Sequence, residues 1–152
     1  MRIRNVKSDD IVSFIEVYQK SYSGLEKYAY TRRKDIKHYF KWLYNRDSDG
    51  FLLAEINNRV VGFVACDANW ISFINGKKMG EIHELFVLPQ FRRKHIGTSL
   101  LIKAISYARK KGRKFAELWV GKENYVAIRF YKKFGFQESG SVGIWLRMTK
   151  EL

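Results

Sequence analysis

Hydrophobic and polar residues follow two different rhythms along this chain. In four stretches the apolar residues recur every three or four positions, which is the spacing of an amphipathic helix. We expect the first helix to start at Ser8 as its N-cap and to end at Ser23-Gly24, since Ser and Gly favour these positions. The remaining helices are predicted at about Arg32–Tyr44, Ile96–Lys111 and Asn124–Phe134.

Shorter β-rich runs lie between the predicted helices. They are Arg2–Lys7, Phe51–Ile56, Val60–Asp67, Glu81–Val87, Phe115–Val120, and a final pair from Phe136 and Val142–Met148. The turn residues Asn57-Asn58-Arg59 predict a hairpin between the second and third runs. Ala68–Gly80 fits either strand or loop. This order predicts an α/β (α+β) fold with a mixed sheet and helices on both of its faces.

The segment from Glu81 to Leu101 joins a strand, a basic turn and the start of a helix. Pro89 stops the strand, and the basic residues Arg92–His95 fill the connection before Ile96. The first amides of a helix have no partner within it, and the helix dipole favours negative charge there. A basic turn at this position therefore predicts an anion site, suited to the phosphates of a cofactor.

Length and composition limit the class of protein. The 152 residues, 46% hydrophobic and 16% aromatic, predict one ordered domain spanning 1–152. The single cysteine, Cys66, excludes an internal disulfide and a zinc site built on several cysteines, and we expect no metal. No apolar run approaches the roughly 18 residues of a membrane span, and the first ten residues lack a signal-peptide core. We therefore expect a cytoplasmic protein without a membrane partner.

The net charge of +14 is the most unusual property of the composition. It is compatible with a merely well-solvated surface or with a polyanionic partner. No Asp or Glu occurs between Gln90 and Lys114, so the basic bias is strong around the predicted anion site. The bias also extends to Arg32–Lys37, so it is not confined there.

Two motifs of the sequence resemble motifs of the GNAT superfamily of N-acetyltransferases, which use acetyl-coenzyme A. Arg92–Gly97 is similar to the pyrophosphate loop of that family. Asn124, Tyr131 and Gly135-Phe136 are similar to its second motif. The resemblance extends over essentially the whole chain. It implies a mostly antiparallel sheet of six to seven strands with splayed fourth and fifth strands, and acetyl-CoA as co-substrate.

His95 departs from the family pattern, which usually has a Gly at that position. A Gly would let the backbone pass close to the phosphates. If the position needs a positive φ, His is among the less costly alternatives. The other interpretation is ordinary helical backbone with the side chain in solvent. We expect the departure to weaken cofactor binding rather than abolish it, because Gly97 is retained.

The resemblance also implies a set of cofactor-binding residues. Backbone groups of the strand would contact the pantetheine arm and the thioester oxygen, and the loop would hold the pyrophosphate. Asn124 would bond the pantetheine arm, although its position fits a helix N-cap equally well. The complete set is Leu85, Phe86, Val87, Arg92, Arg93, Lys94, His95, Ile96, Gly97, Thr98, Asn124 and Tyr131. The alternatives are simple core strand residues and a solvated basic turn.

Acetyl transfer to an amine also needs an acid and a base. By resemblance, Tyr131 protonates the departing thiolate; alternatively it is only a core aromatic residue. Glu84 is our first choice for the base and Glu81 the second, followed by Glu117 on the next strand. Strand alternation predicts Glu81 and His83 on one face and Glu84 on the other. Each acid could instead make a structural hydrogen bond, and we expect His83 to be structural.

The expected function is transfer of the acetyl group from acetyl-CoA to a primary amine. The acceptor would be a small molecule or a protein N-terminus or lysine, reacting by direct attack in a ternary complex, with Tyr28, Tyr30 and Trp70 near it. One alternative is a non-catalytic acyl-CoA-binding module. Another is a basic nucleic-acid-binding domain, which is disfavoured because no nucleic-acid signature occurs. Gly143–Leu146 is an apolar candidate for homodimerisation.

Overall fold

The computed structural model describes all residues from Met1 to Leu152. Its strands form one seven-stranded sheet in the order β1-β2-β3-β4-β5-β7-β6. The strands are β1 (Arg2–Asn5), β2 (Phe51–Ile56), β3 (Arg59–Ile71), β4 (Lys78–Val87), β5 (Phe115–Gly121), β6 (Gln137–Val142) and β7 (Trp145–Glu151). The helices are α1 (Ile11–Ser21), α2 (Arg33–Arg46), α3 (Ile96–Lys110) and α4 (Tyr125–Lys133).

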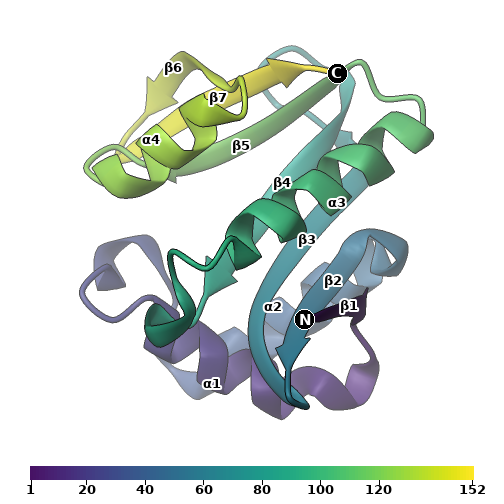
Figure 1. Cartoon of the computed structure of the whole chain (residues 1–152). Coiled ribbons are helices and arrows are strands. Elements are labelled where there is room, and N and C mark those ends of the chain that lie inside the picture. Colours follow the sequence, from purple (N-terminus) through teal and green to yellow (C-terminus); the bar gives the residue numbers. More distant parts are fainter.

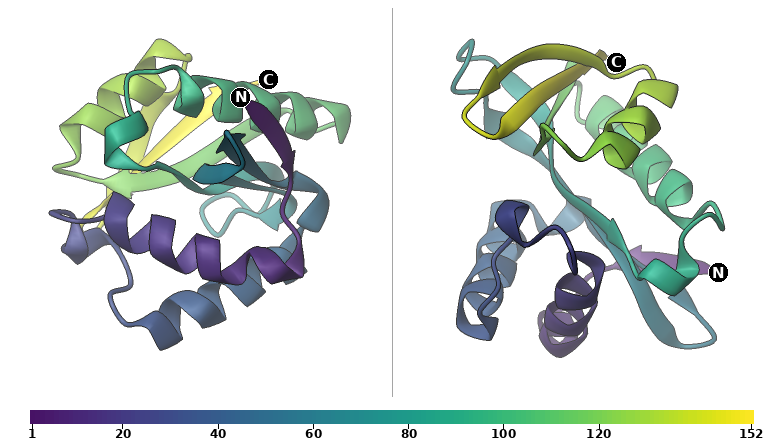
Figure 2. Two further views of the ribbon diagram at one scale, coloured as in Figure 1. Left: turned by 60° about the horizontal axis from the view of Figure 1, so that its bottom comes forward. Right: turned by 90° about the vertical axis from the view of Figure 1, so that its left-hand side faces the viewer.

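The helices cover both faces of the sheet, as predicted. Helices α1 and α2 pack side by side on one face, and α3 and α4 lie on the other (Figure 1; Figure 2, right). All neighbouring strands are antiparallel except β4 and β5, which run parallel. The predicted mixed α/β fold is therefore confirmed.

Strands β4 and β5 separate after a short paired segment. They are in register only where Gly80–Ile82 faces Ala116–Leu118. Beyond this segment the strands diverge, and Figure 1 shows β4 running away from β5 and toward the start of α3. The splay predicted for the fourth and fifth strands is confirmed, and it leaves the rest of β4 without a strand on that side.

The structure resolves the ambiguous stretch between the third and fourth predicted strands. β3 continues past the predicted Asp67 to Ile71, and β4 starts at Lys78 rather than Glu81. Ile71 pairs with Lys78, and the intervening residues form the tip of a long hairpin. The turn between β2 and β3 is also confirmed, because Asn57 and Asn58 have φ angles of 51° and 65°, as a tight hairpin turn requires.

Several element boundaries differ from the predicted ones. Ser8 does not cap α1 but begins a short 3₁₀ turn, Ser8–Asp10, and α1 starts at Ile11. There the carboxylate of Asp10 accepts hydrogen bonds from the Lys7 amide, at 2.7 Å, and from Arg4. The last two strands also start and end later than predicted. Five of the six residues of the edge strand β6 are exposed, so that strand has no buried face to produce an alternating pattern.

Phe14 of α1 fixes the helical layer on the sheet. Its ring is fully buried and packs at 5.1–5.9 Å, mostly edge to face, against the rings of Tyr18, Phe40, Phe51, Phe63 and Phe86. Such contacts add to the hydrophobic stabilisation of a core. Because Phe86 belongs to β4, this cluster holds the unpaired half of β4 against α1.

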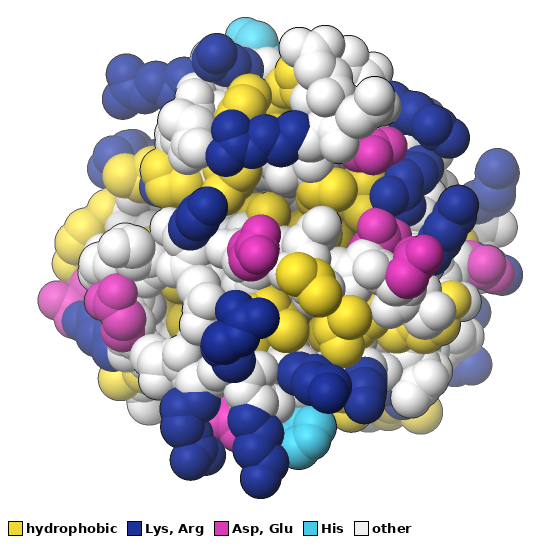
Figure 3. Space-filling view, turned by 90° about the horizontal axis from the view of Figure 1, so that it is seen from below, with side chains coloured by type: hydrophobic (Ala, Val, Ile, Leu, Met, Phe, Trp, Pro, Cys, Tyr) yellow, Lys and Arg dark blue, Asp and Glu magenta, His cyan; other side chains and the backbone are white.

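On the face that Figure 3 shows, the positive charge is distributed rather than collected in one patch. On the end of the molecule that carries α1 and α2, Lys and Arg side chains are spread over the surface with acidic side chains between them (Figure 3). No helix is both long enough and apolar enough to span a bilayer. The predicted pairing segment Gly143–Leu146 forms the β6–β7 turn and the start of β7, where Ile144 is exposed.

Candidate functional site

A cleft of about 1540 Å³ opens where β4 and β5 separate. Its walls come from β4, β5, the start of α3, helix α4 and the segment before α2. It collects nearly all the residues that we proposed for cofactor binding and catalysis. The exceptions are Glu117, the third candidate base, and Lys94, whose ammonium lies over the ring of Phe91. The predicted residues that line the cleft are Glu81, Glu84, Leu85, Phe86, Val87, Arg92, Arg93, His95, Ile96, Gly97, Thr98, Asn124 and Tyr131.

The connection between β4 and α3 has an unusual backbone. Arg93 and His95 have φ angles of 62° and 63°, in the left-handed region that favours Gly. Ordinary helical backbone at His95 is therefore excluded, whereas its side chain is exposed as expected. His95 immediately precedes α3, so the first free amides of that helix border the cleft. This arrangement fits a pyrophosphate.

Arg92 has a bracing role within the loop. Its Nη2 donates a hydrogen bond of 2.7 Å to the carbonyl oxygen of Ser21 at the end of α1, and its Nε donates one of 3.3 Å to the carbonyl oxygen of Val87. The guanidinium thus ties the loop to both α1 and β4. We expect Arg92 to supply positive charge and rigidity to the phosphate site rather than a free, flexible ligand.

The unpaired edge of β4 suits an extended chain such as pantetheine. From Glu84 to Val87 this strand pairs with β3 on one side and has no strand partner on the β5 side. Its backbone groups can therefore bond an extended ligand in place of the missing strand, as in strand addition. Phe86 and Val87 keep their side chains in the core, so the cofactor role and the core role do not compete.

A β-bulge changes the side-chain directions in β4. Ala65 faces Glu84 and Cys66 faces Ile82, so His83 is an extra residue in β4 at this point. The His83 ring lies 4.9 Å from the ring of Trp42, and Glu84 is bonded by Tyr39, both of α2. The prediction that His83 and Glu84 face opposite sides of the sheet is wrong, because the bulge breaks the alternation.

Glu84 is held between two tyrosine hydroxyls. Tyr22 donates a short hydrogen bond to Oε1, and Tyr39 donates one of 2.7 Å to Oε2. Burial raises the pKa of Glu84 to about 7, although both tyrosine hydrogen bonds favour its charged form. A carboxyl with this pKa is divided between its two protonation states near neutral pH, which suits a general base.

Glu81 lies in a different environment, beside Glu117. The two residues are register partners on β4 and β5, and both are almost completely buried. Ser72 and Arg147 bond Glu117, and although burial opposes its ionisation, the hydrogen bonds from Glu81, Arg147 and Ser72 lower its pKa. Burial and then Glu117 raise the pKa of Glu81 to about 11. Glu81 is thus protonated at neutral pH and has no capacity to accept a proton.

Tyr131 and Asn124 occupy the α4 wall of the cleft. The Tyr131 ring packs against Phe130 and Phe136, yet no protein group bonds its hydroxyl. Burial and then the charge of Glu84 raise the pKa of Tyr131, which keeps it protonated. Asn124 accepts a hydrogen bond of 3.4 Å from the Ala127 amide and is the N-cap of α4. Its capping role does not exclude it from the cleft, which it also lines.

The sequence did not predict the hydrogen bonds that Tyr22 and Tyr39 donate to Glu84. Each does occur at helical spacing with core residues, so the pattern contained no signal for a polar role. Their role depends on contacts with a residue 62 and 45 positions away, respectively.

Comparison with known proteins identifies the family of this chain. The model of the acetyltransferase (GNAT) family matches residues 11–136. The chain is 55% identical over 150 residues to an uncharacterized N-acetyltransferase from Methanocaldococcus jannaschii, covering 99% of this chain and 66% of that relative. It is 56% identical over 145 residues to one from Archaeoglobus fulgidus, covering 94% and 99% of the two chains. The chain thus spans about two thirds of the first relative and nearly all of the second.

Solved structures agree in fold. A Pyrococcus horikoshii protein of 39% identity superposes with a TM-score of 0.91, covering 99% of this chain and 98% of its own. The PaiA N-acetyltransferase from Thermoplasma acidophilum, solved in complex with coenzyme A, has 25% identity and a TM-score of 0.83, with coverages of 99% and 98%. With the splayed strands, the loop and the family match, the chain belongs to the GNAT family of N-acetyltransferases.

Proposed function

We propose that this protein transfers the acetyl group of acetyl-CoA to a primary amine by direct attack in a ternary complex. The acceptor would be a small molecule or a protein N-terminus or lysine. The observation that carries the proposal is the placement of Glu84 and Tyr131 in one cleft, on β4 and α4, beside the phosphate-binding loop. One group can take a proton and the other can give one.

Glu84 is the proposed general base. Only the neutral form of an amine can attack a carbonyl carbon, so an acceptor that is protonated at neutral pH first releases a proton to solvent. As the nitrogen bonds to the acetyl carbon, Glu84 takes the proton that the nitrogen loses, directly or through water. Its pKa of about 7 matches this task, because a base works best when its pKa lies near the working pH. Glu81, already protonated, is set aside as the base.

Tyr131 is the proposed general acid. When the carbon–sulfur bond breaks, Tyr131 gives its hydroxyl proton to the departing sulfur and so prevents a free thiolate. The hydroxyl is suited to this because it is protonated and makes no bond to the protein. The proton taken up by Glu84 balances the proton lost by Tyr131, so the cycle closes when the two exchange protons with solvent.

Acetyl-CoA itself would be held by the residues already described. The amides of Ile96, Gly97 and Thr98 at the start of α3 would bind the pyrophosphate, together with the positive charge of the loop. The open edge of β4 would bind the pantetheine arm and orient the thioester carbonyl. Binding supplies an activated acetyl group in register with Glu84 and Tyr131.

A thiol-release assay over a panel of primary amines and peptide N-termini tests the proposal. We expect turnover with at least one amine class, and loss of it in both Glu84→Gln and Tyr131→Phe while acetyl-CoA still binds by calorimetry. A protein that binds acetyl-CoA but releases thiol with no amine would contradict the proposal and favour a non-catalytic acyl-CoA-binding module. A protein that fails to bind acetyl-CoA would contradict both.

A further inference from the structure

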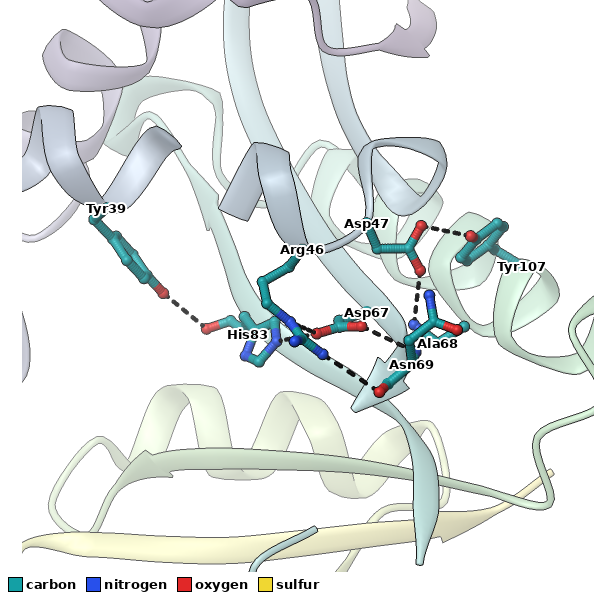
Figure 4. Close-up of polar contacts among 8 residues, drawn as sticks. All are labelled: Tyr39, Arg46, Asp47, Asp67, Ala68, Asn69, His83 and Tyr107. Atoms are coloured by element: carbon teal, nitrogen blue, oxygen red, sulfur yellow. Dashed lines mark hydrogen bonds and ion pairs between the residues drawn. The ribbon is translucent and has the colours of Figure 1, made fainter. Parts of the chain in front are cut away.

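The imidazole of His83 is held rigidly at the edge of the cleft. Its Nε2 lies 3.0 Å from Oδ2 of Asp67 on the adjacent strand β3. Arg46 of α2 donates from Nε to the same oxygen at 2.7 Å, and the Asn69 amide donates to the other oxygen at 2.9 Å. Figure 4 shows this network between α2, β3 and β4. Asp67 is therefore itself fixed, with its side chain only 2% exposed.

Two tryptophans confine the same ring from its sides. The ring centroids of Trp42 and Trp70 each lie 4.9 Å from that of His83, at interplanar angles of 69° and 90°. The imidazole thus has one orientation, set by one hydrogen bond and two near-perpendicular aromatic contacts. A ring positioned in this way resembles a functional imidazole oriented by a carboxylate.

The hydrogen bond also determines which nitrogen is free. Burial disfavours the charged form of Asp67, but hydrogen bonds from His83 and Arg46 outweigh burial and lower the pKa of Asp67 to about 2. Asp67 is therefore a carboxylate, which can only accept hydrogen bonds. In the neutral imidazole the proton is then on Nε2, and Nδ1 presents a lone pair. No protein group bonds Nδ1, and His83 lines the cleft.

The bulge in β4 turns the side chains of His83 and Glu84 to the same side of the sheet. The two residues are consecutive, both face α2 and both line the cleft. Consecutive Cα atoms are about 3.8 Å apart, so one small molecule can contact both side chains. The surrounding aromatic residues, Tyr30, Tyr39 and Trp70, would enclose its carbon chain.

We infer that His83 forms an acceptor subsite, in which Nδ1 accepts a hydrogen bond from a second donor group of the acceptor while its reacting amine lies at Glu84. The inference rests on the proposed function. It defines the substrate class as a primary amine that carries a nearby hydroxyl or second amino group. The carboxylate of Glu84, which lines the cleft, also favours a cationic ligand locally, despite the net charge of +14.

Matched acceptors test the subsite. The acceptors have carbon chains of about two to four atoms, a length that can bridge two neighbouring residues. At each chain length, kcat/KM is compared for the monoamine, the amino alcohol and the diamine. We expect the wild-type protein to favour the second-donor compounds by about tenfold, the discrimination that one good polar contact provides. The amino alcohol and diamine arms show whether hydroxyl or ammonium is the better donor.

Variants then assign the preference to His83. His83→Phe keeps an aromatic ring between the tryptophans but removes Nδ1, and we expect the ratio to fall to about two or less. His38→Phe, which changes an exposed histidine on α2, is the matched control and should keep the wild-type ratio. If His83→Phe does not fold, as judged by melting and acetyl-CoA binding, His83→Leu replaces it, because Leu is smaller and also lacks a hydrogen-bond acceptor.

The outcomes separate the two claims. Turnover of monoamines without any preference for a second donor in the wild type, or a preference that survives in the His83 variant, overturns the subsite and leaves the proposed function intact. Absence of turnover with every amine, with acetyl-CoA still bound, contradicts the proposed function and the subsite with it.

Discussion

His83 and Glu84 are consecutive residues of β4, yet both side chains face α2. One packs against Trp42 and the other is bonded by Tyr39. A single extra residue at the β3–β4 bulge produces this arrangement, at the point where β4 leaves β5. Bulges often redirect side chains beside functional sites. The bulge therefore gives this cleft both its proposed base and its proposed acceptor subsite.

Replacing Glu84 with Gln should lower kcat by about 10²–10⁴-fold, the range for removal of a general base. The substitution keeps the size of the side chain and can still accept from one tyrosine. We expect the dissociation constant for acetyl-CoA to stay within about twofold, because the phosphate loop is untouched. Steady-state kinetics and calorimetry measure the two quantities, and an unchanged kcat would assign the proton transfer to solvent.

The pH dependence of the reaction should report Glu84. Since the carboxylate form is the base, kcat/KM of the wild type should rise with pH through about 7, the pKa of Glu84. In Tyr39→Phe the charged form of Glu84 loses one hydrogen bond. The pKa of Glu84, and with it the pH at which kcat/KM rises, should therefore increase. A shift of roughly one pH unit is expected, since one pKa unit is about 1.4 kcal/mol and such a bond contributes about that much.

Tyr44→Phe is the control for that shift. Tyr44 lies on the same helix, packs against Phe40 and does not line the cleft. Its profile should coincide with that of the wild type. If kcat/KM of Tyr39→Phe rose at a lower pH than that of the wild type, this would be inconsistent with a carboxylate base at position 84.

Replacing Tyr131 with Phe should lower kcat by about 10²-fold or more, because the departing sulfur loses its proton donor. The packing against Phe130 and Phe136 remains, so the melting temperature should change little. The loss should shrink with an acyl donor whose thiol is more acidic, since a better leaving group needs less protonation. An equal loss with both donors would argue for a packing role.

The Glu81–Glu117 pair should make stability depend on pH. The raised pKa of Glu81 means that the folded chain keeps a proton that the unfolded chain releases above about pH 4.5. Stability from this group is therefore present at low pH and is lost as the pH rises toward about 11. Glu81→Gln has no such proton. Its melting temperature should therefore rise relative to that of the wild type by about 8–16 °C between pH 6 and 9, because one retained proton changes the free energy of unfolding by about 1.4 kcal/mol per pH unit.

Glu117→Gln is the contrasting variant. Glu117 is fully buried and bonds the buried Arg147. Removing its charge leaves the guanidinium without its partner, which destabilises by about 3–5 kcal/mol. Thermal melts of both variants over pH distinguish the two carboxyls. Equal destabilisation by the two substitutions would contradict the assignment of the proton to Glu81.

Replacing His95 with Gly should tighten acetyl-CoA binding. The backbone at this position already has a φ of 63°, so Gly can adopt it without strain and lets the loop approach the phosphates. We expect the dissociation constant to fall severalfold, on the order of 1 kcal/mol. His95→Val should weaken the fold, because a β-branched residue is disfavoured at positive φ. An unchanged dissociation constant in the Gly variant would contradict the proposal that His95 weakens acetyl-CoA binding.

The sequence by itself determined most of the secondary structure, and it predicted the residues of the proposed cofactor-binding half of the site. Helices and strands follow local periodicity, and the phosphate loop is a contiguous segment, Arg92–Gly97, that leads directly into α3. Local spacing contains such features because the residues that form them are neighbours in the chain. The bounds of the edge strand β6 were not predicted correctly because this strand has no buried face. The start of α1 was not predicted correctly because a 3₁₀ turn precedes the helix.

Only the tertiary structure decided the chemistry at the other end of the cleft. The tyrosines that hold Glu84 come from α1 and α2, and Asp67, which orients His83, comes from β3. The bulge that turns both β4 residues to one side depends on how β3 and β4 pair. Strand register and helix packing are long-range properties, so periodicity placed Glu84 on the right strand but on the wrong face relative to His83.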